Sequence, residues 1–270
     1  MARSLNFVTL VGTLVQDPET TAISDTNSVT RFTISGTEHV IGDDGKEHHP
    51  GWYHQINVFG SYGTWLAERL IAGSVVFVHG RLDYRSWETP EKERRSRVSV
   101  IGEYVELLEY GPRGNDPVTL DNREQPRLKH ARNEVIVSGN LTRDAEAATT
   151  PAGRSRTSFT LAFNHEYRKR SGDRVTQTHF VNVTCWNDLA DAAAALTKGS
   201  RVIAIGRLAN ESWTASTTNT TRYETRITAD TLEFGLNAIS TSVSDAITEG
   251  APEPEDAPED LPPQDETPLL

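Results

Sequence analysis

The 270-residue sequence contains a single cysteine, Cys185, and a single methionine. One thiol cannot build an internal disulfide framework, which excludes the small disulfide-stapled scaffolds. No apolar run approaches the ~18 residues that a membrane-spanning helix needs. The N-terminal stretch MARSLNFVTL is too poor in apolar residues for a signal peptide, so we expect a cytoplasmic protein.

Basic charge is also scarce, since the formal net charge is −11. Most of this excess lies at the C-terminal end, where residues 237–270 carry nine acidic side chains and no Lys or Arg. Residues 1–236 together carry only −2. The whole-chain charge therefore does not argue against a local basic surface that binds nucleic acid.

Two segments lack the apolar periodicity of folded elements. Residues 237–270 are rich in proline and acid, and they cannot bury enough apolar surface to offset their ordering entropy, which predicts a disordered acidic tail. Residues 111–131 contain three prolines and mixed charge. This composition indicates an interdomain linker.

The rest of the chain contains an internal repeat, most visible in HGRLDYRSWETP and its echo IGRLANESWTAS. Matching residues lie 127 positions apart early in each copy and 126 apart later, as in Asn6/Asn133, Gly12/Gly139, Phe32/Phe159, Gly73/Gly199 and Trp87/Trp213. Solenoid repeats are much shorter, about 20 to 50 residues. We therefore predict two tandem domains, residues 1–110 and 132–236, each long enough to bury its own core.

Each copy has the alternation and β-branched content of half-buried strands, interrupted by one helix. The helix is SYGTWLAERLIAG in the first copy and NDLADAAAALTKG in the second, and we expect Gly73 and Gly199 to serve as C-caps. The order is three strands, a helix and two strands. It predicts an all-β protein of two five-stranded Greek-key barrels of the oligonucleotide/oligosaccharide-binding (OB) type.

The repeated Gly-Arg-Leu-x-x-x-Ser-Trp motif places a guanidinium and an indole on one strand face. If alternation persists, Arg81, Arg85 and Trp87 share that face, as do Arg207 and Trp213 in the second copy. Cations track phosphates and flat aromatic faces stack on bases, so the pair suits single-stranded nucleic acid.

Two alternatives stay open for this motif. A strand Trp is commonly a core residue, and Gly80 or Gly206 could host a bulge that reverses the face on which Arg and Trp lie.

The motifs together resemble a family. NFVTLVGTLVQDPE (residues 6–19), WYHQINVFG (residues 52–60) and the Gly-Arg-Leu…Ser-Trp stretch are similar to those of bacterial single-stranded-DNA-binding proteins, and NEVIVSGNLTRDAE with IGRLANESW is a looser second copy. A chain with two such domains resembles the members from the Deinococcus–Thermus group. That resemblance implies a homodimer with four OB domains.

The resemblance also implies which side chains contact DNA. The expected stacking aromatics are Tyr53, Phe59 and Trp87 in the first copy and Tyr167, Phe180, Trp186 and Trp213 in the second. Val40 stands where the second copy has Tyr167. The expected phosphate partners are Arg81, Arg85, Arg94, Arg95, Arg97, Arg154, Arg156, Arg168, Lys169, Arg170, Arg174 and Arg207. Taken alone, the run at 168–170 could be an ordinary solvated face.

Other chemistry finds little support in the sequence. His48, His49 and His54 suggest a metal cluster, but no C-x-x-C or H-x-x-x-H spacing accompanies them, so we expect neither a metal nor a cofactor. Asp43 and Asp44 are typical of a turn. The leading hypothesis is a non-enzymatic protein that coats single-stranded DNA in replication, recombination and repair; a nuclease and a scaffold for proteins or sugars are the alternatives.

The acidic tail offers a further expectation. Family members usually end in an acidic peptide with a terminal Pro-Phe that replication and repair enzymes capture. This chain ends in Asp265, Glu266, Thr267, Pro268, Leu269 and Leu270, which keeps the acid, the proline and an apolar end but lacks the aromatic ring. We expect partner docking with altered affinity; the alternative is a merely solubilising tail.

Overall fold

The computed structural model describes residues 4–24, 27–42, 45–89, 92, 94–108, 117–151, 153–168, 172–214 and 221–234; for Arg94 and for residues 212–214 and 221–223 it describes the backbone alone. The expected tail, Lys169 and Arg170 lie outside the described residues. None of the helices in the described ranges has the length and apolarity to cross a membrane.

The first repeat contains β1 (Asn6–Leu14), β2 (Glu19–Ser24), β3 (Asn27–Thr37), β4 (Val40–Ile41), β5 (Glu47–His48), β6 (Gly51–Phe59), α1 (Gly60–Ala67), β7 (Val75–Glu88) and β8 (Arg94–Leu107). Strand β1 pairs with β7, β7 with β8, β8 with β6, β6 with β3, and β3 again with β1. These five strands close into a barrel.

The second repeat contains β11 (Arg132–Leu141), β12 (Glu146–Thr149), β13 (Ser155–Arg168), β14 (Arg174–Trp186), α2 (Asn187–Ala193), β15 (Arg201–Thr214) and β16 (Thr221–Phe234). Its strands close in the same order, β11–β15–β16–β14–β13 and back to β11. The predicted succession of three strands, a helix and two strands is confirmed in both copies.

Each barrel is filled by the apolar residues that alternation predicts. The repeat offset pairs buried side chains one for one: Leu10/Val137, Phe32/Phe159, Ile34/Leu161, Ile56/Val183 and Leu82/Leu208. The two cores are therefore built from apolar side chains at equivalent positions of the two repeats.

The prediction that Gly73 and Gly199 cap the helices is wrong. The helices end at Ala67 and Ala193, and the glycines occupy a later turn, with φ of 84° and 85°. There Gly73 N–H donates to the carbonyl of Leu14, and Gly199 N–H donates to that of Leu141, each at 2.8 Å. Glycine is suited to this turn because its positive φ strains other residues.

Gly80 and Gly206 lie beside bulges, as the sequence analysis allowed. The extra residue belongs to the partner strand, so β7 and β15 keep their own alternation through the glycine. A Cβ on Gly80 would clash with the Ile101 carbonyl, and one on Gly206 with that of Thr228. The glycine of the repeated motif is required by this close backbone approach.

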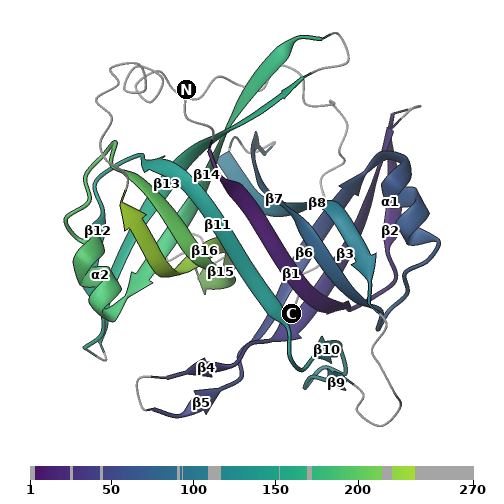
Figure 1. The fold of residues 1–270 in the computed structure, drawn as a ribbon, viewed down its shortest axis with the longest axis horizontal. Coiled ribbons are helices and arrows are strands. Elements are labelled where there is room, and N and C mark those ends of the chain that lie inside the picture. Colours follow the sequence, from purple (N-terminus) through teal and green to yellow (C-terminus); the bar gives the residue numbers. More distant parts are fainter. Residues whose placement is uncertain are drawn as a thin grey trace.

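The two barrels join edge to edge, because β1 pairs antiparallel with β11 from Asn6↔Val137 to Val11↔Arg132. The two strands run side by side through the middle of the molecule (Figure 1). A continuous sheet β8–β7–β1–β11–β15–β16 results. Within the predicted linker, β9 (Val118–Leu120) and β10 (Pro126–Leu128) pair with each other, and Leu128 adds to β3 opposite Gly36.

Candidate nucleic-acid interface

The outer face of β3 and β6 carries the first candidate surface. Directly paired residues share a face, and the register pairs Val29 with Phe59 and Arg31 with Asn57. The guanidinium carbon of Arg85, on β7, lies 6.0 Å from the centre of the Phe59 ring. An aromatic ring and three guanidinium groups thus occupy one outer surface, since Arg97 lies opposite Arg85 in the β7–β8 ladder; we call it the Phe59 surface (Arg31, Phe59, Arg85 and Arg97).

The electrostatics of the Phe59 surface show crowded positive charge. Burial lowers the pKa of the Arg31 guanidinium, and the positive charges of Arg85 and Arg97 lower it further, against an opposing effect of Glu19. Arg85 also pairs with the buried Asp83 carboxylate at 3.0 Å. An anion such as phosphate would relieve the repulsion among these guanidinium groups.

The β7–β8 hairpin extends this surface. The register places Trp87 opposite Arg95 and Arg85 opposite Arg97, so these four side chains share one face of the hairpin. Trp87 is 46% exposed, which excludes a core role for it. The backbone of Arg94 pairs with that of Glu88 in the ladder.

In the second barrel the corresponding aromatic residue is Trp186, which pairs directly with Arg156. The guanidinium carbons of Arg154 and Arg156 lie 4.8 Å and 5.8 Å from the centre of its ring. Both distances fall within the ~6 Å range of a cation–π contact. We call these three residues the Trp186 surface.

Carboxylates neutralise part of the positive charge near Trp186. Glu211 lies 3.9 Å from Arg156 and 3.0 Å from Arg226. Arg226 also pairs with Glu224. Arg154 is exposed and extends the surface toward solvent.

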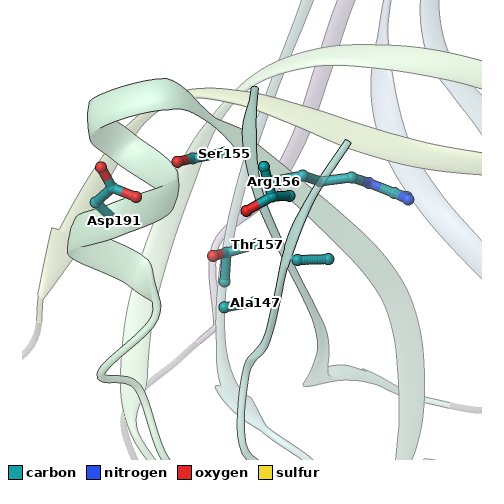
Figure 2. Close-up of a pocket in the computed structure, with 7 residues that line it drawn as sticks. Ala147, Ser155, Arg156, Thr157 and Asp191 are labelled. Carbon is teal, nitrogen blue, oxygen red and sulfur yellow. The ribbon is translucent and has the colours of Figure 1, made fainter. Parts of the chain in front are cut away.

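A shallow hollow of about 300 Å³ lies behind this surface, between β12, β13 and α2. Figure 2 shows that the Arg156 side chain extends away from α2, while Ser155, Thr157 and Asp191 face the hollow. Its lining includes the acidic Asp191 and no aromatic residue. Arg156 therefore borders both the hollow and the Trp186 surface, but the Trp186 ring does not line the hollow.

The β13–β14 hairpin carries the remaining candidates of the second barrel. Its ladder pairs Arg168 with Arg174 and Tyr167 with Val175, so Tyr167 projects from the face opposite to that of Phe180 and Trp186. Tyr167 is 40% exposed and stacks on His165 at 5.9 Å between ring centres. Arg174 pairs with Glu166 at 3.6 Å.

Tyr53 and Phe180 lie in the seam between domains. The Tyr53 hydroxyl donates to Asp121, and the Arg127 guanidinium carbon lies 5.3 Å from the ring centre. Burial and the Asp121 hydrogen bond raise the pKa of Tyr53. The β9–β10 segment thus covers Tyr53, and Phe180 packs edge-on against Tyr84 with ring centres 5.3 Å apart.

The arginines of the repeated Gly-Arg motif also have protein partners. Arg81 pairs with Glu103 at 3.1 Å and Arg207 with Asp230 at 3.3 Å, and in both cases the acid is the extra residue of the bulge. Arg207 pairs in addition with Glu38 at 3.3 Å. These contacts give both arginines a structural role.

The structure therefore brings some predicted residues together and separates others. The first barrel brings together Phe59, Arg85, Arg97, Arg95 and Trp87. The second barrel brings together Arg154, Arg156 and Trp186. The side chain of Trp213 lies outside the description, although its backbone pairs with that of Arg222. Sequence reasoning missed Arg31, which alternation along VTRFTI would have placed on the solvent face of β3.

Two closed five-stranded barrels with aromatic and guanidinium groups on their outer faces define a tandem OB-fold protein of the single-strand-binding class. The family model of the single-strand binding protein family matches residues 5–108 and again residues 132–235. The chain belongs to the single-strand binding protein family, and the resemblance drawn from its motifs is confirmed.

Known single-stranded DNA-binding proteins resemble this chain over most of its length. The single-stranded DNA-binding protein of Deinococcus radiodurans is 40% identical over 235 residues, which is 86% of this chain and 76% of that protein. That of Thermus thermophilus is 40% identical over 233 residues, covering 86% and 85%. The crystal structure of the Thermus aquaticus protein matches with a TM-score of 0.68 at 31% identity, covering 88% of this chain and 97% of that one.

Proposed function

We propose that this protein binds single-stranded DNA without sequence preference and without catalysis, through the Phe59 and Trp186 surfaces. The observation that carries the proposal is the Trp186 ring flanked by two guanidinium groups at 4.8 Å and 5.8 Å. Such a group stacks on any base and holds the adjacent phosphates, because every base has a π-face. Coating transient single strands in replication, recombination and repair, in the cytoplasm at the nucleoid, is the role that fits this activity.

Within this proposal the predicted contact residues have different roles. Phe59, Trp87 and Trp186 stack on bases, while Arg31, Arg85, Arg95, Arg97, Arg154 and Arg156 hold phosphates. The exposed β13–β14 hairpin adds Tyr167, Arg168 and Arg174. Lys169 and Arg170, which follow Arg168 in the sequence, belong to the same proposed path, as do Arg94 and Trp213. The contact between the two domains is supported by Tyr53 and Phe180. The two bulges are supported by Arg81 and Arg207.

The protein is proposed to form a homodimer through the outer face of the joined six-stranded sheet. Phe7 is paired with Ile136 and Ile136 with Ile205, so these three side chains line up across the seam. Phe77 packs edge-on against Tyr104 on the same face, at 6.2 Å. Phe7 is 45% exposed and Tyr104 50% exposed, so a second copy of this face would cover apolar surface that the monomer leaves in water.

The C-terminal residues Asp265, Glu266, Pro268, Leu269 and Leu270 are proposed to dock replication and repair proteins. Acidic and apolar groups next to one another in the sequence suit a basic pocket with an apolar floor. Deleting residues 245–270 should abolish capture of such enzymes and raise affinity for single strands at low salt, because an anionic tail competes with DNA. Unchanged capture and unchanged salt dependence would show that the tail is inert.

The central experiment is a titration of intrinsic Trp fluorescence with a dT homopolymer. We expect quenching that weakens with salt, and much weaker binding of a duplex of matched length, because paired bases hide their π-faces. Equal affinity for single strand and duplex at fixed salt would contradict the proposal. Cleavage of the DNA with added Mg²⁺ would favour the nuclease alternative.

A further inference from the structure

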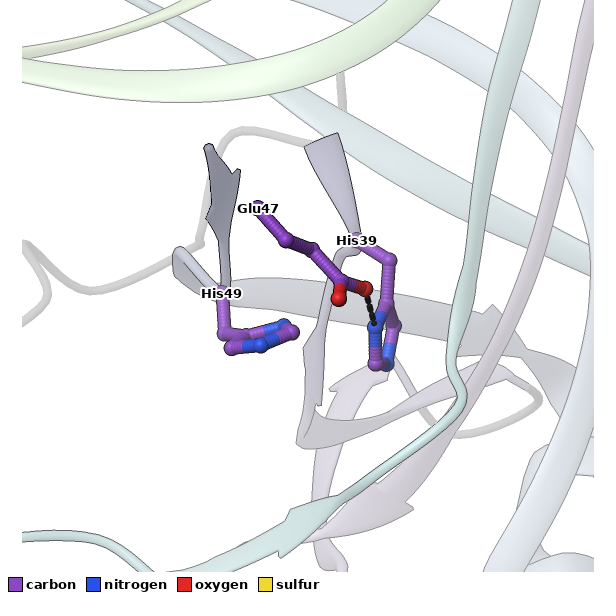
Figure 3. Close-up of side chains that lie close together, drawn as sticks. All are labelled: His39, Glu47 and His49. Atoms are coloured by element: carbon purple, nitrogen blue, oxygen red, sulfur yellow. Dashed lines mark hydrogen bonds and ion pairs between the residues drawn. The ribbon is translucent and has the colours of Figure 1, made fainter. Parts of the chain in front are cut away.

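A cluster of potential metal ligands lies at the β4–β5 hairpin, away from both proposed DNA surfaces. His39 precedes β4, Glu47 begins β5 and His49 follows it; one nitrogen of each histidine and a Glu47 carboxylate oxygen all lie within 4.8 Å of one another. Figure 3 shows the three side chains converging from the two arms of the hairpin. All three are exposed, so an ion has access from solvent.

The hydrogen bonds of His39 determine which of its nitrogens is a ligand. Its Nε2 lies 3.1 Å from the carbonyl oxygen of Lys129, and a carbonyl can only accept, so Nε2 carries the proton. Its Nδ1 lies 2.8 Å from Oε1 of Glu47. In the neutral imidazole two lone pairs would then face each other, and a cation is required between them.

A proton on Nδ1 can supply that positive charge, which makes the contact with Glu47 an ion pair. A metal ion can supply it too, with one advantage. It would also engage His49, whose ring lies edge-on to His39 at 4.6 Å between ring centres. A carbonyl that accepts from the distal nitrogen of a histidine is the arrangement that orients metal-binding imidazoles in proteins.

His130 limits the movement of His39. The two rings are stacked, with centres 4.9 Å apart and planes 15° apart. The stacked ring, together with the Lys129 hydrogen bond, holds the Nδ1 of His39 toward Glu47. One ligand is thereby positioned in advance, which lowers the conformational cost of binding an ion.

We propose that His39 Nδ1, the Glu47 carboxylate and His49 bind one divalent transition-metal ion, with Zn²⁺ as the best match. Two imidazoles and one carboxylate form a donor set of open zinc sites, in which water takes the fourth position. Imidazole donors favour Zn²⁺ and its neighbours over Mg²⁺ or Ca²⁺. Ligands on a tetrahedral ion lie roughly 3.3 Å apart, so His49 would need to approach the other two ligands by no more than about 1.5 Å. The hydrogen-bonded pair of His39 Nδ1 and Glu47 Oε1, now 2.8 Å apart, would open slightly to admit the ion.

The ion would cross-link the two arms of the β4–β5 hairpin. Strands β4 and β5 form a separate sheet, in which the described residues give the pairs Val40↔His48 and Ile41↔Glu47. An ion that joins His39 to Glu47 and His49 would close the base of this hairpin and, through Lys129, tie it to the segment that leads into β11. Divalent metal would thus order the first repeat's hairpin.

The second repeat offers a natural comparison. The residues 127 positions after His39, Glu47 and His49 are Glu166, Arg174 and Thr176. Glu166 and Arg174 form an ion pair at 3.6 Å, so this hairpin is closed by two protein charges without a metal ligand set. The metal site is therefore specific to the first repeat.

Calorimetric titration of the metal-free full-length protein with ZnCl₂ tests the proposal. We expect one tight site per chain, and a loss of affinity of at least tenfold in each of H39A, H49A and E47Q. The matched controls are H165A, which removes an imidazole outside the cluster, and E166Q, which removes the corresponding carboxylate of the second repeat; both should bind as the wild type does. Excess Mg²⁺ should not displace Zn²⁺.

Two further measurements keep the result unambiguous. Circular dichroism of each variant establishes that the fold is retained, and Co²⁺ substituted for Zn²⁺ should give the visible absorption of a tetrahedral site in the wild type but not in H39A. Zinc binding of equal affinity in the H39A/H49A double variant and the wild type would overturn the proposal. So would the absence of any Zn²⁺ site in the wild type.

Discussion

The side-chain amide of Asn133 donates to Oε1 of Glu38 at 2.7 Å and so joins the two domains. The same amide donates to the Leu208 carbonyl at 2.9 Å, and its oxygen accepts from Leu208 N–H at 3.0 Å. In the first repeat Asn6 makes the equivalent pair of bonds with Leu82, each at 2.9 Å. Asn6 and Asn133 thus make the same pair of backbone contacts in the two repeats. Of these two residues, Asn133 also binds a residue of the other domain.

Asn133→Ala should therefore destabilise the protein more than Asn6→Ala. Both lose the two backbone contacts, but only the first leaves the half-buried Glu38 carboxylate without its amide donor. We expect a loss of about 2–4 kcal/mol in the free energy of unfolding for Asn133→Ala and about 1–2 kcal/mol for Asn6→Ala, from the cost of unsatisfied buried groups. Urea denaturation measures both, and equal losses would show that the Glu38 contact contributes nothing.

Buried histidines predict acid sensitivity. Burial lowers the pKa of His54 from 6.5 to about 4, and that of His179 likewise to about 4. The unfolded chain then binds more protons between these pH values, so the free energy of unfolding falls as the pH drops from about 6.5 to about 4 and is constant above that window. The loss is on the order of 3 kcal/mol for each histidine by pH 4.

His54→Val provides the matched variant, because the second repeat has Val181 at this position, fully buried in its core. The difference in unfolding free energy between pH 7 and pH 4 should shrink by about 3 kcal/mol in this variant. Urea curves at both pH values decide the matter. Parallel pH dependences of variant and wild type would mean that His54 does not titrate in this range.

Trp186→Ala should weaken single-strand binding by about 1–3 kcal/mol, the usual increment of one base stacked on an aromatic ring. Trp65→Ala is the control, because Trp65 is also exposed and carries Arg69 at 4.2 Å over its ring, but it lies on α1. Fluorescence anisotropy of a labelled dT oligomer gives both affinities. A normal affinity for Trp186→Ala would remove Trp186 from the interface.

The Phe59 surface predicts a change in salt dependence. Each phosphate contact contributes roughly 0.7 to the slope of log K against log salt for single strands. Arg31→Ala and Arg85→Ala should each reduce the slope by about that amount. Arg132→Ala should not, because this exposed residue pairs with Glu134 at 2.5 Å on the sheet β1–β11. Unchanged slopes in the first two variants would exclude phosphate contacts there.

The joined sheet predicts a homodimer whose mass by light scattering is about twice the 29.9 kDa of one chain. Phe7→Glu and Tyr104→Glu place a charge in the centre of its apolar face and should shift the mass toward one chain. Trp65→Glu alters an equally exposed aromatic residue on α1 and should leave the dimer intact. A monomeric wild type at micromolar concentration would contradict the assembly.

Much of this fold is visible in the sequence because its signals are local. Strand alternation and the order of elements depend on residues close together in the chain, and the spacing of Asn6/Asn133 or Phe32/Phe159 reveals the duplication directly. The helix ends were misjudged for the same reason: a glycine at Gly73 indicates a positive φ but does not say whether a helix or a turn uses it.

The candidate site divides in the same way. Alternation predicts correctly that Arg85 and Trp87 share a face of β7, since both lie on one strand. Arg31 lies beside Phe59 because of the register between β3 and β6. Arg127 covers Tyr53 because of the way residues 117–128 pack against β6. Contacts between distant segments leave no periodic signal in either segment.

The sequence by itself determined that this protein consists of two OB barrels with aromatic and basic residues on defined strand faces, because backbone periodicity and repeat spacing encode both. Only the tertiary structure decided that β1 and β11 merge the barrels into one sheet, and that His39, Glu47 and His49 meet around one point. The physical reason is that edge pairing and ligand geometry depend on distances between segments, which no single stretch of chain specifies.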